Sequence, residues 1–168
     1  FSGLYQRAFD IESEEYLPDE QIKAYSDIGV NGIWTQGVLS RLTEFPFDRS
    51  LSEGYEKRLE RMRRLTERLD KYGIKLYLYI NEPRSMPLEF FENNPDIKGH
   101  VKGENACLCI STEKVKNYLS NAIEQICREV PKMFDCHIID GFSSNSLSRY
   151  FMSSSDCVSE PTIGATSV

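Results

Sequence analysis

The chain has 168 residues, of which 40% are hydrophobic and 27% are charged. This composition excludes global disorder and suffices for one domain with a core. The formal net charge of −6 at pH 7 argues against a nucleic-acid partner, which would need a basic face, and gives no reason to expect binding to anionic lipid. No stretch of the sequence approaches the length of a transmembrane helix, so we expect no membrane partner.

Cysteine and histidine spacings favour neither a disulfide framework nor a metal site. The five cysteines are odd in number, and most lie in predicted strands or a helix, which favours a reducing compartment such as the cytoplasm. Cys107 and Cys109 are too close for a zinc knuckle, and His100 and His137 are not at metal-ligand spacing. We therefore expect no metal and no cofactor.

The first predicted elements are a strand, a helix and a second strand. Residues 4–11 alternate weakly and predict a strand. Pro18 opens a helix, because proline suits the first turn and the acids that follow it favour the positive helix end. Gly29 ends that helix, and residues 30–36 form the second predicted strand.

A long loop, a helix and a third strand follow. The loop, 37–52, contains Phe45 and Phe47, whose aromatic rings predict ordered packing. Residues 53–72 predict the clearest helix, since apolar residues recur at intervals of three and four opposite a face rich in Arg, Glu and Lys. The strand 74–80 is mostly apolar and only partly alternating, as expected in a parallel sheet.

The remaining predicted elements continue the alternation. We expect a short helix within 85–95, a loop to residue 105, and a fourth strand over 106–110. Ser111 or Thr112 caps the next helix, which carries an apolar stripe and ends at Pro131. A fifth strand covers 136–139.

This order predicts an α/β fold, a parallel (β/α) barrel of the TIM type. Strands that alternate with helices are joined by right-handed crossovers and lie parallel. A complete barrel takes about 250 residues, so we expect an incomplete N-terminal portion over 1–146, with an irregular tail over 147–168. The alternative is an open doubly wound sheet, against which stands the lack of a Gly-rich phosphate loop.

Polar residues follow each predicted strand, and in a parallel barrel they would converge on one mouth. Carboxylates, amides and guanidinium groups at such a mouth suit sugar hydroxyls. Glycoside hydrolysis further needs two carboxyl groups, one acting as acid and one as base or nucleophile. The positions after the strands are Asp10, Glu12, Gln36, Asn81, Glu82, Arg84, Ser111, Asp140, Ser144 and Asn145.

Each candidate has a structural alternative. Glu82 is a candidate catalytic carboxylate, or it forms a structural pair with Arg84 or a neighbouring helix. Asp140 is the second candidate, or an aspartate that forms the turn before Gly141. Trp34 is a stacking platform for a sugar ring, or a core residue of an apolar strand.

Three junctions resemble those of the α-glucuronidases. Residues 25–33 are similar to their IGINGxV helix–strand junction, and 72–81 to their YGIKxYLxxNF strand. The helix over 113–128 and the Val-Pro-Lys-Met-Phe that begins at Val130 are similar to their helix ending in IPDFGG. The resemblance, which extends more distantly to the β-N-acetylhexosaminidases of glycoside hydrolase family 20, implies a (β/α)8 barrel.

The sequence departs from the family where the chemistry lies. The family places the glutamate of a Ser-Glu pair near Ser144, where its proton donor stands, and a hydroxyl cannot protonate a leaving oxygen as a carboxylic acid can. The family's Asn-Phe after the third strand is Asn81-Glu82 here, so Glu82 gains no role from that match.

We therefore expect a glycoside-hydrolase-like domain, or part of one, that acts on a carbohydrate substrate at the carboxyl ends of its strands. Asp140 and Glu82 are the catalytic candidates. The alternative is a non-catalytic or degenerate carbohydrate-binding fragment. The sequence indicates neither the sugar nor the oligomeric state. The expected substrate-binding residues are Gln36, Trp34, Asn81, Arg84 and Asn145.

Overall fold

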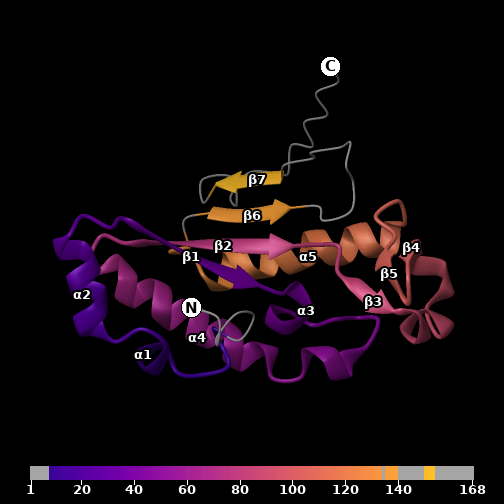
Figure 1. Ribbon diagram of the computed structural model, residues 1–168, viewed down its shortest axis with the longest axis horizontal. Helices are drawn as coiled ribbons and strands as arrows, with labels where there is room; N and C mark the ends of the chain where they lie inside the picture. Colours follow the sequence, from indigo (N-terminus) through magenta and orange to yellow (C-terminus); the bar gives the residue numbers. More distant parts are fainter. Residues whose placement is uncertain (1–7, 134, 140–149, 154–168) are drawn as a thin grey trace, which may run out of the picture.

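The larger of two sheets contains four strands. The computed structural model describes residues 8–133, 135–139 and 150–153, with side chains for 8–133. The strands lie in the order β1 (Gly32–Gly37), β2 (Lys75–Asn81), β6 (Asp135–Ile139) and β7 (Tyr150–Ser153), as Figure 1 shows. The first three are parallel, and β7 is antiparallel to β6.

Two long helices cover one face of this sheet. Helix α4 (Tyr55–Asp70) connects β1 to β2, and α5 (Glu113–Glu129) lies between β2 and β6 in the chain. Because neighbouring parallel strands follow one another in one direction across the sheet, right-handed crossovers place both helices on the same face. The two helices contact each other, and α4 contacts β2. The core between helices and sheet includes Leu59, Met62, Leu65, Leu69, Leu76, Leu78, Ile80, Val115, Ile123 and Ile126.

The N-terminal segment packs on α4 through ion pairs. Helices α1 (Ser13–Tyr16) and α2 (Asp19–Asp27) precede β1. The described part of the predicted first strand, 8–11, is a turn, so that prediction is wrong there. Asp10 accepts two hydrogen bonds from Nη2 of Arg41, at 2.6 and 2.7 Å, and Glu12 pairs with Arg61 on α4. Asp10 and Glu12 therefore hold a turn in place through these arginines and, contrary to the prediction, do not follow the end of a strand.

The segment between β1 and α4 is ordered, as its aromatics predict. It contains α3 (Leu39–Leu42) and the 3₁₀ helix η1 (Arg49–Ser52). The ring of Phe45 is buried and contacts those of Phe47, Phe90 and Tyr118, with centroids 5.2 to 5.9 Å apart. This aromatic cluster joins the loop to α5 and to the segment after β2.

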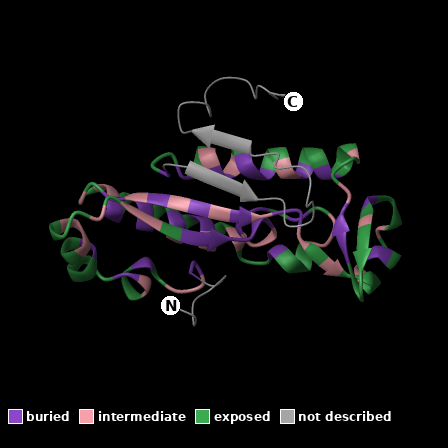
Figure 2. Ribbon diagram, turned by 45° about the horizontal axis from the view of Figure 1, so that its top comes forward, coloured by how far each residue is buried: buried purple, intermediate pink, exposed green. Residues whose placement is uncertain are grey.

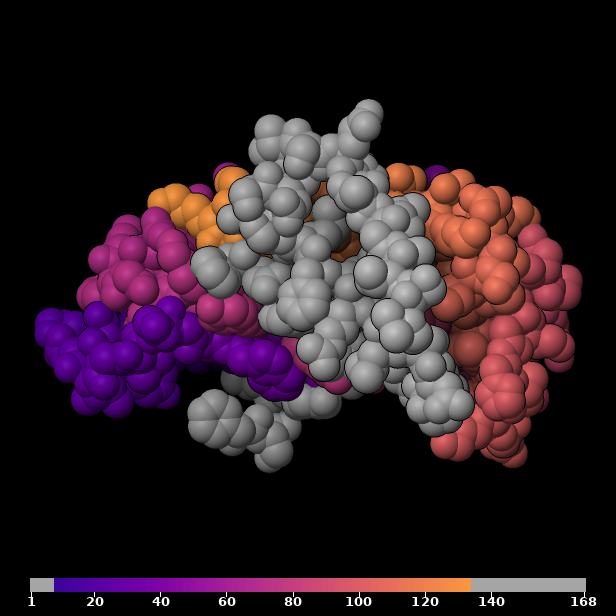
Figure 3. Space-filling model, turned by 90° about the horizontal axis from the view of Figure 1, so that it is seen from above, coloured from indigo at the N-terminus to yellow at the C-terminus, as the bar shows by residue number. Residues whose placement is uncertain are grey.

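A second, antiparallel sheet follows β2. It contains β3 (Ser85–Pro87), β5 (Asn105–Leu108) and β4 (Lys98–Lys102), in that order, with the 3₁₀ helices η2 (Leu88–Glu92) and η3 (Pro95–Ile97) between β3 and β4. Figure 2 shows that β5 is mostly buried whereas β4 is mostly exposed. Figure 3 shows this sheet and α2 at opposite ends of the molecule.

The predicted parallel (β/α) barrel is wrong, and with it a barrel portion over 1–146. The predicted strand over 106–110 corresponds to β5, which pairs with β3 and β4 in the antiparallel sheet instead of joining β2. The larger sheet carries an antiparallel strand beside β6 and is open among the described residues. The physical reason is the partner that β5 takes: it pairs with β3 and β4, two short strands close to it in the chain, and so does not join β2.

Two further predictions are wrong, because β4 lies in the predicted loop before residue 105 and β7 lies in the predicted irregular tail, whereas the helices and the other strands lie close to their expected places. Helix α4 is two residues shorter at each end than predicted, and β1, β2 and β6 match the second, third and fifth predicted strands. Thr112 is the N-cap of α5, and its side chain accepts a hydrogen bond from the Val115 backbone N–H.

Candidate functional site

The face of the larger sheet opposite α4 and α5 carries aromatic and polar side chains, and we call it the open face. In the parallel register Trp34 pairs with Tyr77, and Gln36 with Tyr79. On β2 these tyrosines and Asn81 alternate with fully buried aliphatic residues on the helix side. Cross-strand partners point to the same face, so the open face is defined by Trp34, Gln36, Tyr77, Tyr79 and Asn81.

Trp34 lies outside the core. Its side chain is 55% exposed, and its ring lies 5.1 Å from that of Tyr79 between centroids, tilted by 42°. The Tyr77 ring packs on the backbone of Gly32, where a Cβ atom would come within 2.6 Å of Cε2. Of the two predictions for Trp34, the core position is wrong for this structure.

Glu82 follows β2 and connects the ends of two strands. Its side chain is 3% exposed. One carboxyl oxygen accepts a hydrogen bond from the Leu39 backbone N–H at 3.2 Å, and the other from the Arg84 backbone N–H at 2.8 Å. The Glu82 carboxyl group thus binds the segment after β1 to the segment after β2. The Glu82–Pro83 peptide bond that follows is cis.

Burial raises the pKa of Glu82 to about 7, while the two backbone N–H groups and the Arg84 guanidinium act in the opposite direction. Tyr118 on α5 is also buried, and its pKa is raised by burial and by the nearby Glu82. A carboxyl group that exchanges its proton near neutrality has the property of a general acid. Its two backbone hydrogen bonds and its burial give it a structural role as well.

Two candidates leave buried polar atoms without a partner among the described residues. Oε1 of Gln36 accepts no hydrogen bond, and Nε and Nη2 of Arg84 donate none. Gln36 as a whole is only 6% exposed. Unpaired polar atoms removed from solvent are costly, and native proteins keep few of them. Together with Nε of Arg41 on α3, these are the buried side-chain atoms near the ends of β1 and β2 that lack a hydrogen-bond partner among the described residues.

The structure brings only part of the predicted site together. Gln36, Asn81, Glu82 and Arg84 lie at or just after the carboxyl ends of the neighbouring strands β1 and β2. Ser111 is exposed beside α5. The predicted positions Asp140, Ser144 and Asn145 lie outside the described residues.

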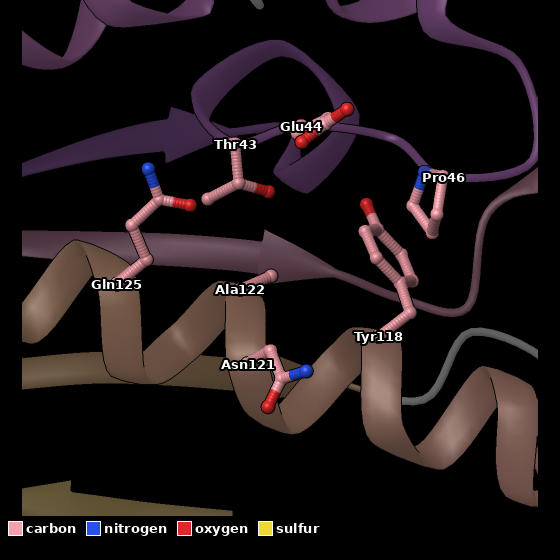
Figure 4. Close-up of a pocket in the computed structure, with 7 residues that line it drawn as sticks. All are labelled: Thr43, Glu44, Pro46, Tyr118, Asn121, Ala122 and Gln125. Atoms are coloured by element: carbon pink, nitrogen blue, oxygen red, sulfur yellow. The ribbon is translucent and has the colours of Figure 1, made fainter.

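A shallow hollow of about 220 Å³ lies on the other side, between α5 and the segment after α3. Figure 4 shows Tyr118 reaching from α5 toward Pro46, with Gln125 further along the helix. The Tyr118 hydroxyl shares a hydrogen bond with Thr43. This hollow is lined by Thr43, Glu44, Pro46, Tyr118, Asn121, Ala122 and Gln125.

The sequence reasoning missed the tyrosines of β2 as site residues. Tyr77 and Tyr79 alternate with Leu76, Leu78 and Ile80, which is the pattern of a strand with two different faces. From the sequence this strand is predicted to be mostly apolar and only partly alternating, whereas burial alternates at every residue from Lys75 to Asn81. Counting tyrosine apart from the aliphatic residues would have separated the faces.

No cluster of potential metal ligands occurs within the described residues, and none of the helices described is long and apolar enough to cross a membrane.

The chain matches no protein-family model, and the comparisons with curated proteins and with solved structures found no similar protein. The resemblance to the α-glucuronidases therefore stays a prediction.

Proposed function

We propose that this chain binds carbohydrate on the open face and at the carboxyl ends of β1 and β2, as part of a glycoside-hydrolase-like protein. The observation that carries the proposal is the exposed ring of Trp34 in contact with Tyr79. Sugar rings present C–H groups that pack on aromatic faces, and exposed large aromatic rings often mark binding sites.

The polar groups beside the rings can form hydrogen bonds with sugar hydroxyls, which ring stacking alone does not provide. Gln36 pairs with Tyr79 in the register, and Asn81 is half-buried two residues beyond it. Amide side chains both donate and accept hydrogen bonds, so they suit hydroxyl groups. The aromatic pair would hold the ring of a sugar while the amides select its hydroxyls.

Calorimetric titration of the chain with a panel of neutral and acidic oligosaccharides tests this proposal. We expect saturable binding to at least one of them, and a loss of about tenfold or more in affinity for Trp34→Ala. Ile28→Ala is the matched control, because Ile28 is an apolar residue, 77% exposed, at the end of α2. Equal affinity in Trp34→Ala and the parent chain would contradict the proposal.

Hydrolysis by Glu82 is the second candidate, favoured by its pKa of about 7. A glycosidase needs a second carboxyl group, and Asp140 remains the predicted one. An aryl-glycoside panel would compare the parent chain with Glu82→Gln and Asp140→Asn, each checked for folding by circular dichroism. Turnover that disappears in both folded variants supports hydrolysis; turnover that is absent from the parent chain, or unchanged in the variants, rejects it.

A further inference from the structure

Arg84 differs from Arg61 and Arg68 in how its guanidinium group is used. The edge formed by Nε and Nη2 can make two parallel hydrogen bonds. Arg61 uses both atoms to bind Glu12, at 2.9 and 2.6 Å, and Arg68 uses both to bind Asp19, at 2.9 and 2.6 Å. In Arg84 the same two atoms are buried and have no partner among the described residues.

Within the described part of the chain, Gln36 has an unpaired acceptor, which complements the unpaired donors of Arg84. Its Oε1 is an acceptor with no donor among the described residues, and only 6% of the residue is exposed. An unsatisfied buried acceptor costs about 1 to 3 kcal/mol. An acceptor on β1 and a pair of donors after β2 are thus both unsatisfied at the same end of the sheet.

The two groups belong to segments that Glu82 holds together. Its carboxyl group bonds the backbone N–H of Leu39, three residues after Gln36, and that of Arg84 itself. Figure 1 shows β1 and β2 side by side with their arrowheads at the same end. One ligand lying across these strand ends can therefore meet both groups.

The charges at this end favour a neutral ligand over an anion. Glu82 is buried beside Arg84, and the Arg84 charge acts on its carboxyl group. This carboxyl group balances the guanidinium charge above about pH 7, where it is ionised. The free Oε1 of Gln36 carries a partial negative charge and would repel an anion. A hydroxyl group fits both deficits, because it accepts from Arg84 and donates to Gln36.

We propose that Gln36 and the Nε–Nη2 edge of Arg84 form a subsite for the hydroxyl groups of a neutral sugar, which excludes sugars with an anionic substituent at that position. This inference rests on the proposed carbohydrate binding and names the class of sugar. The guanidinium edge bonds one or two ring hydroxyl oxygens, and a hydroxyl hydrogen bonds Oε1 of Gln36.

Calorimetric titrations with matched sugars at pH 8, where Glu82 is ionised, test the class of sugar. The panel pairs neutral methyl glycosides with their deoxy, uronate and sulfated counterparts. We expect the neutral glycoside to bind best, with about tenfold loss for the deoxy form at the critical hydroxyl and weaker binding for the charged forms. Tighter binding of the uronate or the sulfate would overturn the subsite.

Three variants separate the subsite from the fold and from the proposed function. Arg84→Met and Gln36→Met keep side-chain length but remove the polar atoms, so we expect about tenfold weaker binding for each. Arg84→Lys keeps the charge without the paired donors and should not restore affinity. At pH 5, where Glu82 is protonated and needs no counter-charge, the melting temperature of Arg84→Met should not fall, because the variant removes two unpaired buried nitrogens.

The outcomes are distinguishable. If no sugar binds the parent chain, the proposed function fails and the subsite with it. If sugars bind, and their affinity falls in Trp34→Ala but not in Arg84→Met or Gln36→Met, only the subsite is overturned. If Arg84→Lys binds as the parent chain does, the guanidinium edge is not the binding group, and the subsite is likewise overturned.

Discussion

The two faces of the strand β2 are built from different residues, although they alternate along one stretch of chain. Leu76, Leu78 and Ile80 face the helices and are at most 1% exposed. Tyr77 and Tyr79 face the other way and are only half-buried. Parallel strands are usually apolar on both faces, because helices cover both. Here the helices described cover one face only.

This difference separates what stabilises the sheet from what can bind to it. The helix side buries aliphatic groups, each worth about 1.5 to 3 kcal/mol when fully buried. The open face keeps rings and amides that pack laterally, such as the Trp34–Tyr79 pair. Substitutions on the helix side should therefore mainly lower stability, whereas substitutions on the open face should mainly weaken binding.

The largest effect is expected for Leu78→Ala. Leu78 is fully buried in the centre of the core, and truncation of such a residue costs about 2 to 5 kcal/mol because a cavity remains. Tyr79→Ala, one residue further on the open face, should cost about 1 kcal/mol, mostly its ring contact with Trp34. Urea unfolding of both variants measures the difference, and equal losses would show that the open face is as deeply packed as the helix side.

The second effect is a pH dependence of stability that comes from Glu82. Burial raises its pKa from 4.5 to about 7 in the folded chain, so the folded chain retains this proton at pH values where the unfolded chain has lost it. The contribution is fully present below about pH 4.5 and is lost as pH rises to about 7. The pKa difference corresponds to about 3 kcal/mol.

Glu82→Gln isolates this contribution from other groups that titrate over the same range. The amide cannot ionise, and it places an NH₂ group against one of the two backbone N–H donors, Leu39 or Arg84. The variant is thus less stable at pH 5, but its deficit should shrink by about 3 kcal/mol by pH 8. A deficit that stays constant between these pH values would show that Glu82 keeps an ordinary pKa.

The sequence predicts the elements of this fold better than their pairing. Periodicity identifies α4, α5 and the strands β1, β2 and β6, because a helix stripe and a strand run are local patterns. Where β5 pairs is not a local property. Its partners β3 and β4 are short, and β4 is shifted in register, so neither gives a recognisable strand pattern. The alternation rule therefore assigned β5 to a parallel sheet that it does not join.

The candidate site was predictable to a similar extent. The rule that polar residues follow parallel strands identifies Gln36, Asn81, Glu82 and Arg84, which do lie at the ends of β1 and β2. The same rule fails for Asp10, because its segment is a turn held by Arg41. The environment of Glu82 could not be read from the sequence either, since its carboxyl group accepts a hydrogen bond from Leu39 and acts on the pKa of Tyr118, and both residues come from distant segments.

The smallest difference between the two faces is expected at two glycines of β1, one on each face. A Cβ atom at Gly37 would lie 2.9 Å from Cδ1 of Leu78 and 3.1 Å from Cδ1 of Leu42, both buried in the core. Overpacking of a closed core costs about 1 to 3 kcal/mol, so Gly37→Ala should lose about 2 kcal/mol.

Gly32→Ala should cost less, although its contact is shorter. The added Cβ atom meets Cε2 of Tyr77 at 2.6 Å, but this ring is half-buried on the open face and is not enclosed in the core. We expect a loss of about 1 kcal/mol, together with a change in near-ultraviolet circular dichroism that Gly37→Ala does not share. If Gly32→Ala costs more than Gly37→Ala in urea unfolding, the ring of Tyr77 is held as firmly as the core, and the open face is packed against something rather than available to a ligand.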